Sequence, residues 1–166
     1  MSQTTLAPPE ARDPQEVSLD DGLQIVGFRL AGEEYGIDIM CVQEIILPGR
    51  MTELLQVPDF IRGLINLRGS IIPVIDLRMR FGLTVTEQSD DSRIIVTELG
   101  SRTVGIVVDA VSEVLRISSS QIDPPSTIGT LDQAYIKGLV KLEQKLLILL
   151  ELEAVLEQEI PANITA

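Results

Sequence analysis

The chain has 166 residues, of which 45% are hydrophobic but only 3% aromatic, and Trp is absent. That length is enough for one domain with its own core, and the core must be built from Val, Ile and Leu, which also favour strands. Thirteen basic against 25 acidic side chains give a net charge of −12. Surfaces that bind nucleic acid or anionic lipid need an excess of Lys and Arg, so we expect neither partner.

The residue types of common catalytic sites are largely missing. The sequence has no His and one Cys, Cys41, which excludes an intramolecular disulfide, a zinc site of the usual kind and an imidazole-activated nucleophile. Carboxylates are abundant, but Asp38, Asp76 and Asp109 fall at expected strand ends or helix caps, where a structural role is the default. We therefore expect no catalytic residues, no metal site, no cofactor and no enzymatic activity.

Composition separates the two ends of the chain from a folded middle. Residues 1–21 hold three of the nine prolines and five acids, which predicts a flexible acidic tail. A folded domain is expected over residues 22–160, followed by a short tail over 161–166. There is no basic-flanked apolar leader, and the longest apolar run, 146–150, is too short to cross a bilayer. We expect a cytoplasmic protein without direct membrane insertion.

Strand patterns dominate from residue 23 onward. Alternating apolar residues predict two hairpins, one over 25–39 and one over 94–108. Two short, fully apolar runs, 71–75 and 146–150, have the length of buried strands.

Helical signals are few and short. Residues 58–63 place Pro where a first turn tolerates it and Gly where a helix ends, which predicts one short helix. Residues 76–82 predict a second, capped by Asp and closed by Gly. Residues 151–158 predict a C-terminal helix.

An internal repeat is the strongest organisational signal. Residues 61–77 recur in degraded form at residues 136–152, 75 positions later, and residues 36–45 recur at residues 105–114, 69 positions later. Both echoes keep the same order along the chain, and one longer loop accounts for the six-residue difference. The chain therefore consists of two related halves.

Each half offers about five short strands and little helix. Sheets this small avoid exposed edges most easily by closing into barrels. We expect a mainly β fold of two small barrels packed together, joined by an acidic linker over residues 84–92. The expected subdomains are residues 22–83 together with 145–160, and residues 92–144.

The halves differ most at one tight turn. The first has Asn66-Leu67-Arg68-Gly69 where the second has Leu142-Glu143-Gln144. Gly69 predicts a backbone of positive φ, and Arg68 can hold a carboxylate with two parallel hydrogen bonds. Glu44 is the expected partner, since it is the single acid of an apolar segment. The simpler interpretation is that Arg68 only tops a hairpin in solvent.

Several motifs in series resemble the CheW family of bacterial chemotaxis coupling proteins. The resemblance covers about residues 23–156, in more motifs than chance would supply. It is carried by Glu34-Tyr35-Gly36-Ile37-Asp38-Ile39, Val42-Gln43-Glu44-Ile45, Phe60-Ile61-Arg62-Gly63, Asn66-Leu67-Arg68-Gly69, Ile72-Pro73-Val74-Ile75-Asp76-Leu77, Val104-Gly105-Ile106-Val107-Val108-Asp109 and Tyr135-Ile136-Lys137-Gly138-Leu139.

This resemblance implies two five-stranded, SH3-like barrels around a shared core. It also implies a non-enzymatic adaptor that links the cytoplasmic tip helices of chemoreceptors to the regulatory domain of the histidine kinase CheA, within receptor arrays. The groove between the barrels would receive the receptor's helical hairpin, and barrel ends would dock the kinase. The alternative is a β protein that binds a small ligand in the same groove.

The same resemblance suggests which residues face the receptor. The expected receptor-binding residues in the first half are Val42, Glu44, Gly63, Arg68 and Gly69. Val111 and Val114 occupy the equivalent place in the second half and would form the far wall of the groove.

Overall fold

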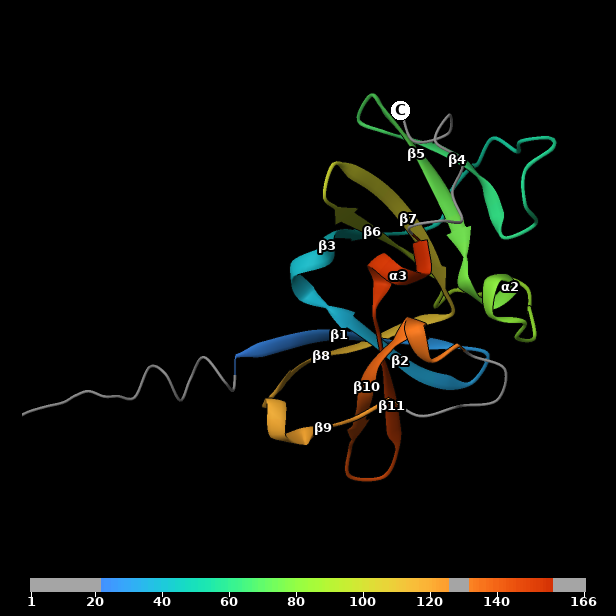
Figure 1. The fold of residues 1–166 in the computed structure, drawn as a ribbon. Helices are drawn as coiled ribbons and strands as arrows, with labels where there is room; N and C mark the ends of the chain where they lie inside the picture. The colour runs from blue at the N-terminus through green and yellow to red at the C-terminus, as the bar shows by residue number, and fades with distance from the viewer. Residues whose placement is uncertain (1–21, 126–131, 157–166) are drawn as a thin grey trace, which may run out of the picture.

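The structure, a computed structural model, describes residues 22–125 and 132–156, which form short strands with little helix (Figure 1). The strands are β1 (Leu23–Leu30), β2 (Glu33–Asp38), β3 (Val42–Ile46), β4 (Ile61–Leu67), β5 (Ser70–Asp76), β6 (Arg93–Leu99), β7 (Arg102–Val108), β8 (Ala110–Ile117), β9 (Ile122–Asp123), β10 (Ile136–Lys141) and β11 (Leu146–Leu150). The helical elements are α2 (Leu77–Phe81), α3 (Leu152–Leu156) and the 3-10 turns η3 (Ile39–Cys41), η4 (Ser119–Gln121) and η5 (Gln133–Tyr135).

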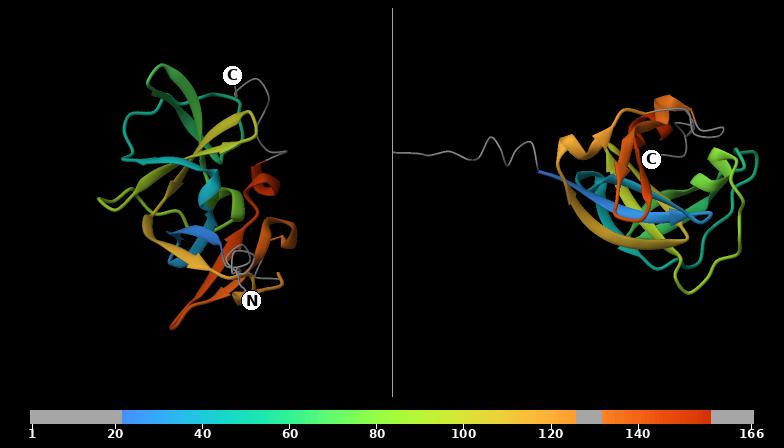
Figure 2. Two further views of the ribbon diagram at one scale, coloured as in Figure 1. Left: turned by 90° about the vertical axis from the view of Figure 1, so that its left-hand side faces the viewer. Right: turned by 90° about the horizontal axis from the view of Figure 1, so that it is seen from below.

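The strands form two sheets. The first has six strands in the order β8-β1-β2-β11-β10-β9, and the second has five in the order β3-β6-β7-β5-β4. The first sheet occupies the lower part of Figure 1 and the second the upper part, and the β10–β11 and β4–β5 hairpins lie at opposite ends of the molecule (Figures 1 and 2). The expected mainly β fold with few short helices is confirmed, and of the two units expected to have five strands each, one has six.

The repeat extends to the strand register. The parallel pair β5–β7 aligns Val74 with Gly105, and the parallel pair β11–β2 aligns Leu149 with Gly36. These pairs are related by the same 75- and 69-residue offsets that relate the sequence segments. Likewise, the register shifts between Val42 and Glu44 in the β3–β6 pair, and the β1–β8 pair shifts at the corresponding place.

The grouping of strands differs from the predicted subdomains. Hairpin β1–β2 of the first half lies in one sheet with β8, β10 and β11 of the second half, while hairpin β6–β7 of the second half lies with β3, β4 and β5 of the first. Each sheet is thus completed by a hairpin from the other half. The predicted division into 22–83 with 145–160 and 92–144 is wrong in this respect, because strand pairing exchanges the hairpins.

The exchange requires the chain to pass from one sheet to the other. Within the described residues this happens at two places, from β2 through η3 to β3, and from β7 through Asp109 to β8. The 69-residue offset relates these two crossovers, so Met40 occupies the position equivalent to Asp109.

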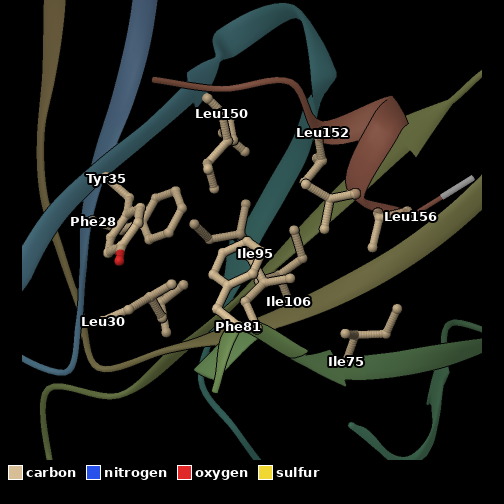
Figure 3. Packing of buried hydrophobic residues seen from close by; sticks show 14 of the residues in the cluster. Phe28, Leu30, Tyr35, Ile75, Phe81, Ile95, Ile106, Leu150, Leu152 and Leu156 are labelled. Carbon is tan, nitrogen blue, oxygen red and sulfur yellow. The ribbon is translucent and has the colours of Figure 1, made fainter. Parts of the chain in front are cut away.

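A shared apolar cluster joins the sheets. It combines Phe28 and Tyr35 of the first sheet with Ile95 and Ile106 of the second and with Phe81 of α2 (Figure 3). All three Phe and both Tyr of the chain belong to this cluster or pack against it. Smaller apolar clusters fill the interior of each sheet separately. The predicted shared core is therefore present, and the few aromatic side chains are concentrated where the sheets meet.

Two of the helix predictions succeed and one fails. Asp76 caps α2 by accepting a hydrogen bond from the backbone N–H of Arg78, and Gly82 ends it in a left-handed conformation. The C-terminal helix is present as α3 over its described part. The helix predicted over residues 58–63 is absent, because Ile61 donates its N–H to the Pro58 carbonyl in a turn and then begins β4.

The two predicted tails, residues 1–21 and 161–166, lie outside the described residues. Among the helices that the structure describes, none is long and apolar enough to span a membrane.

Candidate interaction surface

The turn between β4 and β5 has the conformation that the sequence requires. Arg68 has a φ of 52° and Gly69 a φ of 92°, and positive φ at both central residues is typical of a two-residue hairpin that fits the twist of its strands. The side-chain oxygen of Asn66 accepts a hydrogen bond of 2.8 Å from the Gly69 N–H. The turn therefore holds Arg68 at the tip of a hairpin at one end of the molecule.

Arg68 and Glu44 form the expected pair. Nη1 of Arg68 lies 3.4 Å from Oε1 of Glu44, and Nη2 contacts Oε2, so the guanidinium meets both carboxylate oxygens. The Arg68 side chain is 68% exposed and that of Glu44 27%. The hydrogen bond from Arg68 lowers the pKa of Glu44 below its ordinary value. Arg68 is thus paired with a carboxylate of β3, although most of its side chain stays exposed to solvent.

A hollow lies beside this pair, at the end of the five-stranded sheet that carries the β4–β5 and β6–β7 turns. It has a volume of about 620 Å³ and is lined by Gln43, residues 67–72 and residues 101–103. Arg68 and Gly69 are part of its wall, and the 48% exposed side chain of Ile71 adds an apolar surface. Arg102 and Gln43, which line the hollow from other strands, were not among the predicted site residues.

Gly63 and Val42 contribute in a different way. Gly63 lies at a register shift in β4, and a Cβ added to it would come within 2.6 Å of the Thr52 carbonyl oxygen. Its bare backbone lets Thr52 pair with Leu64 through hydrogen bonds of 2.9 and 2.8 Å. Val42 is half-buried and packs against the shared cluster. Gly63 and Val42 therefore shape the backbone and the core that lie beneath the surface.

Val111 and Val114 lie on β8, the edge strand of the other sheet. Val111 is half-buried against the shared cluster, and Val114 is 53% exposed. The hollow beside Arg68 includes neither residue. By the repeat, Val114 corresponds to Ile45 on β3, which is 41% exposed. Both edge strands thus present an outward aliphatic side chain at the same position.

An ionic network among buried side chains was not apparent from the sequence. Arg78, only 3% exposed, contacts Asp76 through Nη2 at 2.8 Å and Asp109 through Nη1 at 2.7 Å. Arg62 adds a contact of 3.1 Å to Asp76. Burial alone would raise the pKa of Asp76, but the hydrogen bonds and charge of Arg78, with help from Arg62, hold it below its ordinary value. Asp76 and Arg78 are only two residues apart, but Asp109 joins them solely through the fold.

Metal-ligating and reactive side chains are sparse among the described residues. Within residues 22–125 and 132–156, there is no group of three or more His, Cys, Asp or Glu that could hold a metal ion. The free thiol of Cys41 is half-buried, and burial together with nearby carboxylates raises its pKa, which disfavours the reactive thiolate.

Comparisons with known proteins agree with this arrangement. Residues 24–159 match the model of the CheW-like domain. The chain is 44% identical to the chemotaxis protein CheW of Klebsiella aerogenes over 139 residues, 83% of this chain and 84% of that protein. It is 32% identical to CheW of Thermotoga maritima over 135 residues, 81% and 88% of the two chains. The crystal structure of scaffolding protein TtCheW from Thermoanaerobacter tengcongensis superposes with a TM-score of 0.79 at 41% identity, covering 86% of this chain and 94% of that one.

Proposed function

This chain belongs to the CheW-like domain family, and from that premise we propose that it is a non-enzymatic chemotaxis adaptor that couples chemoreceptors to the histidine kinase CheA. The observation that carries the proposal is the family match over residues 24–159, together with a fold that presents a paired Arg68 and Glu44 at the surface. The adaptor would work in the cytoplasm, recruited to receptor arrays.

The receptor-binding surface proposed here consists of Val42, Glu44, Gly63, Arg68 and Gly69, with Val111 and Val114 on the second sheet. Apolar grooves commonly accept the apolar face of an amphipathic helix, as the tip of a receptor would present. The exposed aliphatic side chains of Ile45 and Val114 on the two edge strands support this choice. Arg68, held by Glu44, would fix the orientation of the bound helix.

The kinase would bind elsewhere, at the ends of the sheets. The β10–β11 hairpin lies at the end of the molecule opposite the β4–β5 hairpin that carries Arg68 (Figure 2), so one adaptor could contact a receptor and a kinase at once. The regulatory domain of the kinase is the proposed neighbour. Weak single contacts suffice in an array, because linked contacts raise the overall affinity through effective concentration.

The test is a pull-down of the full chain with CheA and with a cytoplasmic chemoreceptor fragment from the same genome. We expect wild type to bind both, and Arg68→Glu to lose receptor binding while retaining kinase binding and a wild-type circular dichroism spectrum. The reversed charge would repel Glu44 and present the wrong sign to the receptor. Arg50→Glu, in the exposed loop after β3, is the control of equal charge change and should bind like wild type.

The outcomes separate the parts of the proposal. Full receptor binding by a folded Arg68→Glu protein would remove Arg68 from the surface, and recovery of binding in the Glu44→Arg, Arg68→Glu double variant would support the pair as a unit. Wild type that binds neither partner would contradict the adaptor itself. The small-ligand alternative would then be tested by a thermal-shift screen, since a ligand raises stability by mass action.

A further inference from the structure

Two arginines from different sheets line a small polar hollow next to the β7–β8 crossover. Arg29 lies near the end of β1 in the first sheet, and Arg93 begins β6 in the second. The hollow has a volume of about 180 Å³, and Asp91, Ala110 and Val111 also line it. Pockets for drug-sized ligands measure roughly 300–1,000 Å³, so this hollow suits a group of a few atoms, such as the end of a side chain or a small ion.

Arg93 is held so that one edge of its guanidinium stays available. Its Nη1 donates to the backbone carbonyls of Asp90 and Ser92 at 2.8 and 2.7 Å. Among the described residues, no acceptor pairs with its Nε or Nη2. The backbone of the linker before β6 therefore orients this side chain and leaves two further N–H groups for a ligand.

Arg29 is exposed and forms no hydrogen bond or ion pair through its side chain with residues 22–125 or 132–156. Asp91 is the one carboxylate among the described residues that line the hollow, and it pairs with neither Arg29 nor Arg93. Two guanidinium groups and one carboxylate leave an excess of positive charge in this hollow, although the whole chain has a net charge of −12. A bound anion would offset that excess.

The other carboxylates close to Arg29 are engaged elsewhere. Glu34 stands opposite Arg29 in the β1–β2 register, but its carboxylate pairs with Lys145 at 3.6 Å. Asp109, whose N–H donates to the Arg29 carbonyl, has its carboxylate on Arg78 at 2.7 Å. The described part of the chain thus supplies acids around the hollow without using them to neutralise Arg29.

We infer that this hollow is an oxyanion site, in which Arg29 and Arg93 hold one carboxylate or phosphate group between the two sheets. The guanidinium group is a planar fork that binds either group through two parallel hydrogen bonds. Nε and Nη2 of Arg93 supply such a pair of donors, and Arg29 adds its charge and its own donors from the other sheet. The carboxylate would come from an acidic side chain of a bound protein, and the phosphate from solution.

Titration of the isotope-labelled full chain with inorganic phosphate at neutral pH, followed by NMR, tests the chemistry of the site. We expect saturable shifts of the backbone amides of Arg93, Ala110 and Val111, beyond those that sodium chloride causes at equal ionic strength. Arg29→Gln should weaken phosphate binding by about tenfold or more, because it removes charge-assisted hydrogen bonds.

Arg50→Gln is the matched control. It removes the same charge from an exposed loop and should bind phosphate like wild type. Arg29→Lys keeps the charge without the fork and should bind with intermediate affinity. Shifts that do not saturate in wild type, or phosphate binding that is equally tight in Arg29→Gln, would overturn the inference.

Competition with the chemoreceptor fragment identifies the source of the anion. If an acidic side chain of the receptor fills the hollow, the fragment should displace phosphate from wild type, and Arg29→Gln should bind the fragment more weakly than Arg50→Gln does. If fragment and phosphate bind together without affecting each other, the ligand is the free anion. Saturable phosphate binding by a chain that binds no receptor fragment would contradict the proposed coupling function while supporting the oxyanion site.

Discussion

The missing side chain of Gly63 lets the loop after β3 close on the free edge of β4. The backbone there has a φ of 155°, which disfavours other residues, and the Thr52 carbonyl occupies the place of a Cβ. Gly138 repeats the situation in the other half, where an added Cβ would come within 2.8 Å of the Asp123 carbonyl oxygen. The 75-residue repeat therefore places a glycine in both halves where a neighbouring backbone carbonyl comes close.

Gly63→Ala should destabilise the protein. The new methyl group would force Thr52 away from Leu64 and break the two hydrogen bonds between them, and we expect the free energy of unfolding to fall by about 1–3 kcal/mol. Urea denaturation followed by circular dichroism measures this loss. Gly49→Ala is the control, since an added Cβ at Gly49 meets no atom within 4 Å. Equal stability of the two variants would contradict the role assigned to Gly63.

At the scale of elements, α2 depends on one buried carboxylate. Asp76 caps the helix, pairs with Arg78 and receives Arg62 from β4. Its pKa is lowered in the folded state, so the unfolded chain takes up the proton first as the pH falls. The stability that Asp76 contributes is therefore present above the ordinary aspartate pKa of about 4 and is lost as the pH falls through the lower pKa of the folded state.

Asp76→Asn should lower the free energy of unfolding by about 3 kcal/mol at pH 7, because it leaves Arg78 with an unpaired contact in the interior. The same change should flatten the acid limb of the stability curve below about pH 4. Urea denaturation at a series of pH values checks both effects. Asp91→Asn, an exposed acid of the linker, should leave the curve as in wild type. If the free energy of unfolding falls at low pH in Asp76→Asn as it does in wild type, other carboxylates cause that fall.

At the scale of the whole molecule, the exchanged hairpins make the two halves interdependent. Residues 22–91 contain β1 and β2, whose partner strands β8 and β11 lie in the other half. Neither half can complete a sheet alone, and the largest apolar cluster draws on both. The chain should therefore unfold as one cooperative unit in spite of its repeat.

Fragments 1–91 and 92–166 provide the test. Each alone should lack a cooperative thermal transition, because each leaves the edges of the β strands and half of the shared cluster without partners. Mixed together, they should associate in a 1:1 ratio and regain the circular dichroism spectrum of the intact chain. Size-exclusion chromatography with light scattering measures the complex. Independent folding of either fragment would contradict the interdependence.

Much of this structure could be predicted from local patterns, and what could not be predicted depends on distant contacts. The hairpins, the cap of α2 and the Arg68–Glu44 pair followed from residue types and spacing. The exchange of hairpins did not, because a repeat in sequence has the same pattern whether each half pairs with itself or with the other. Arg78 was missed for a similar reason, since Asp109 lies 31 residues away. As parts of a receptor surface, all seven site residues stay predictions: Val42, Glu44, Gly63, Arg68, Gly69, Val111 and Val114.

The exchanged hairpins also suggest how such a chain could arise. A symmetric homodimer of a five-stranded ancestor would have the same pair of sheets if its two copies exchanged their first hairpins. Fusion of the two genes through residues 84–92 would remove the requirement that both copies be identical. One copy could then keep Glu44 opposite Arg68 while the other came to carry Glu113 and Glu143. In a symmetric homodimer, both copies would have the same polar contact. After fusion, the contact between Arg68 and Glu44 could be present in one half alone.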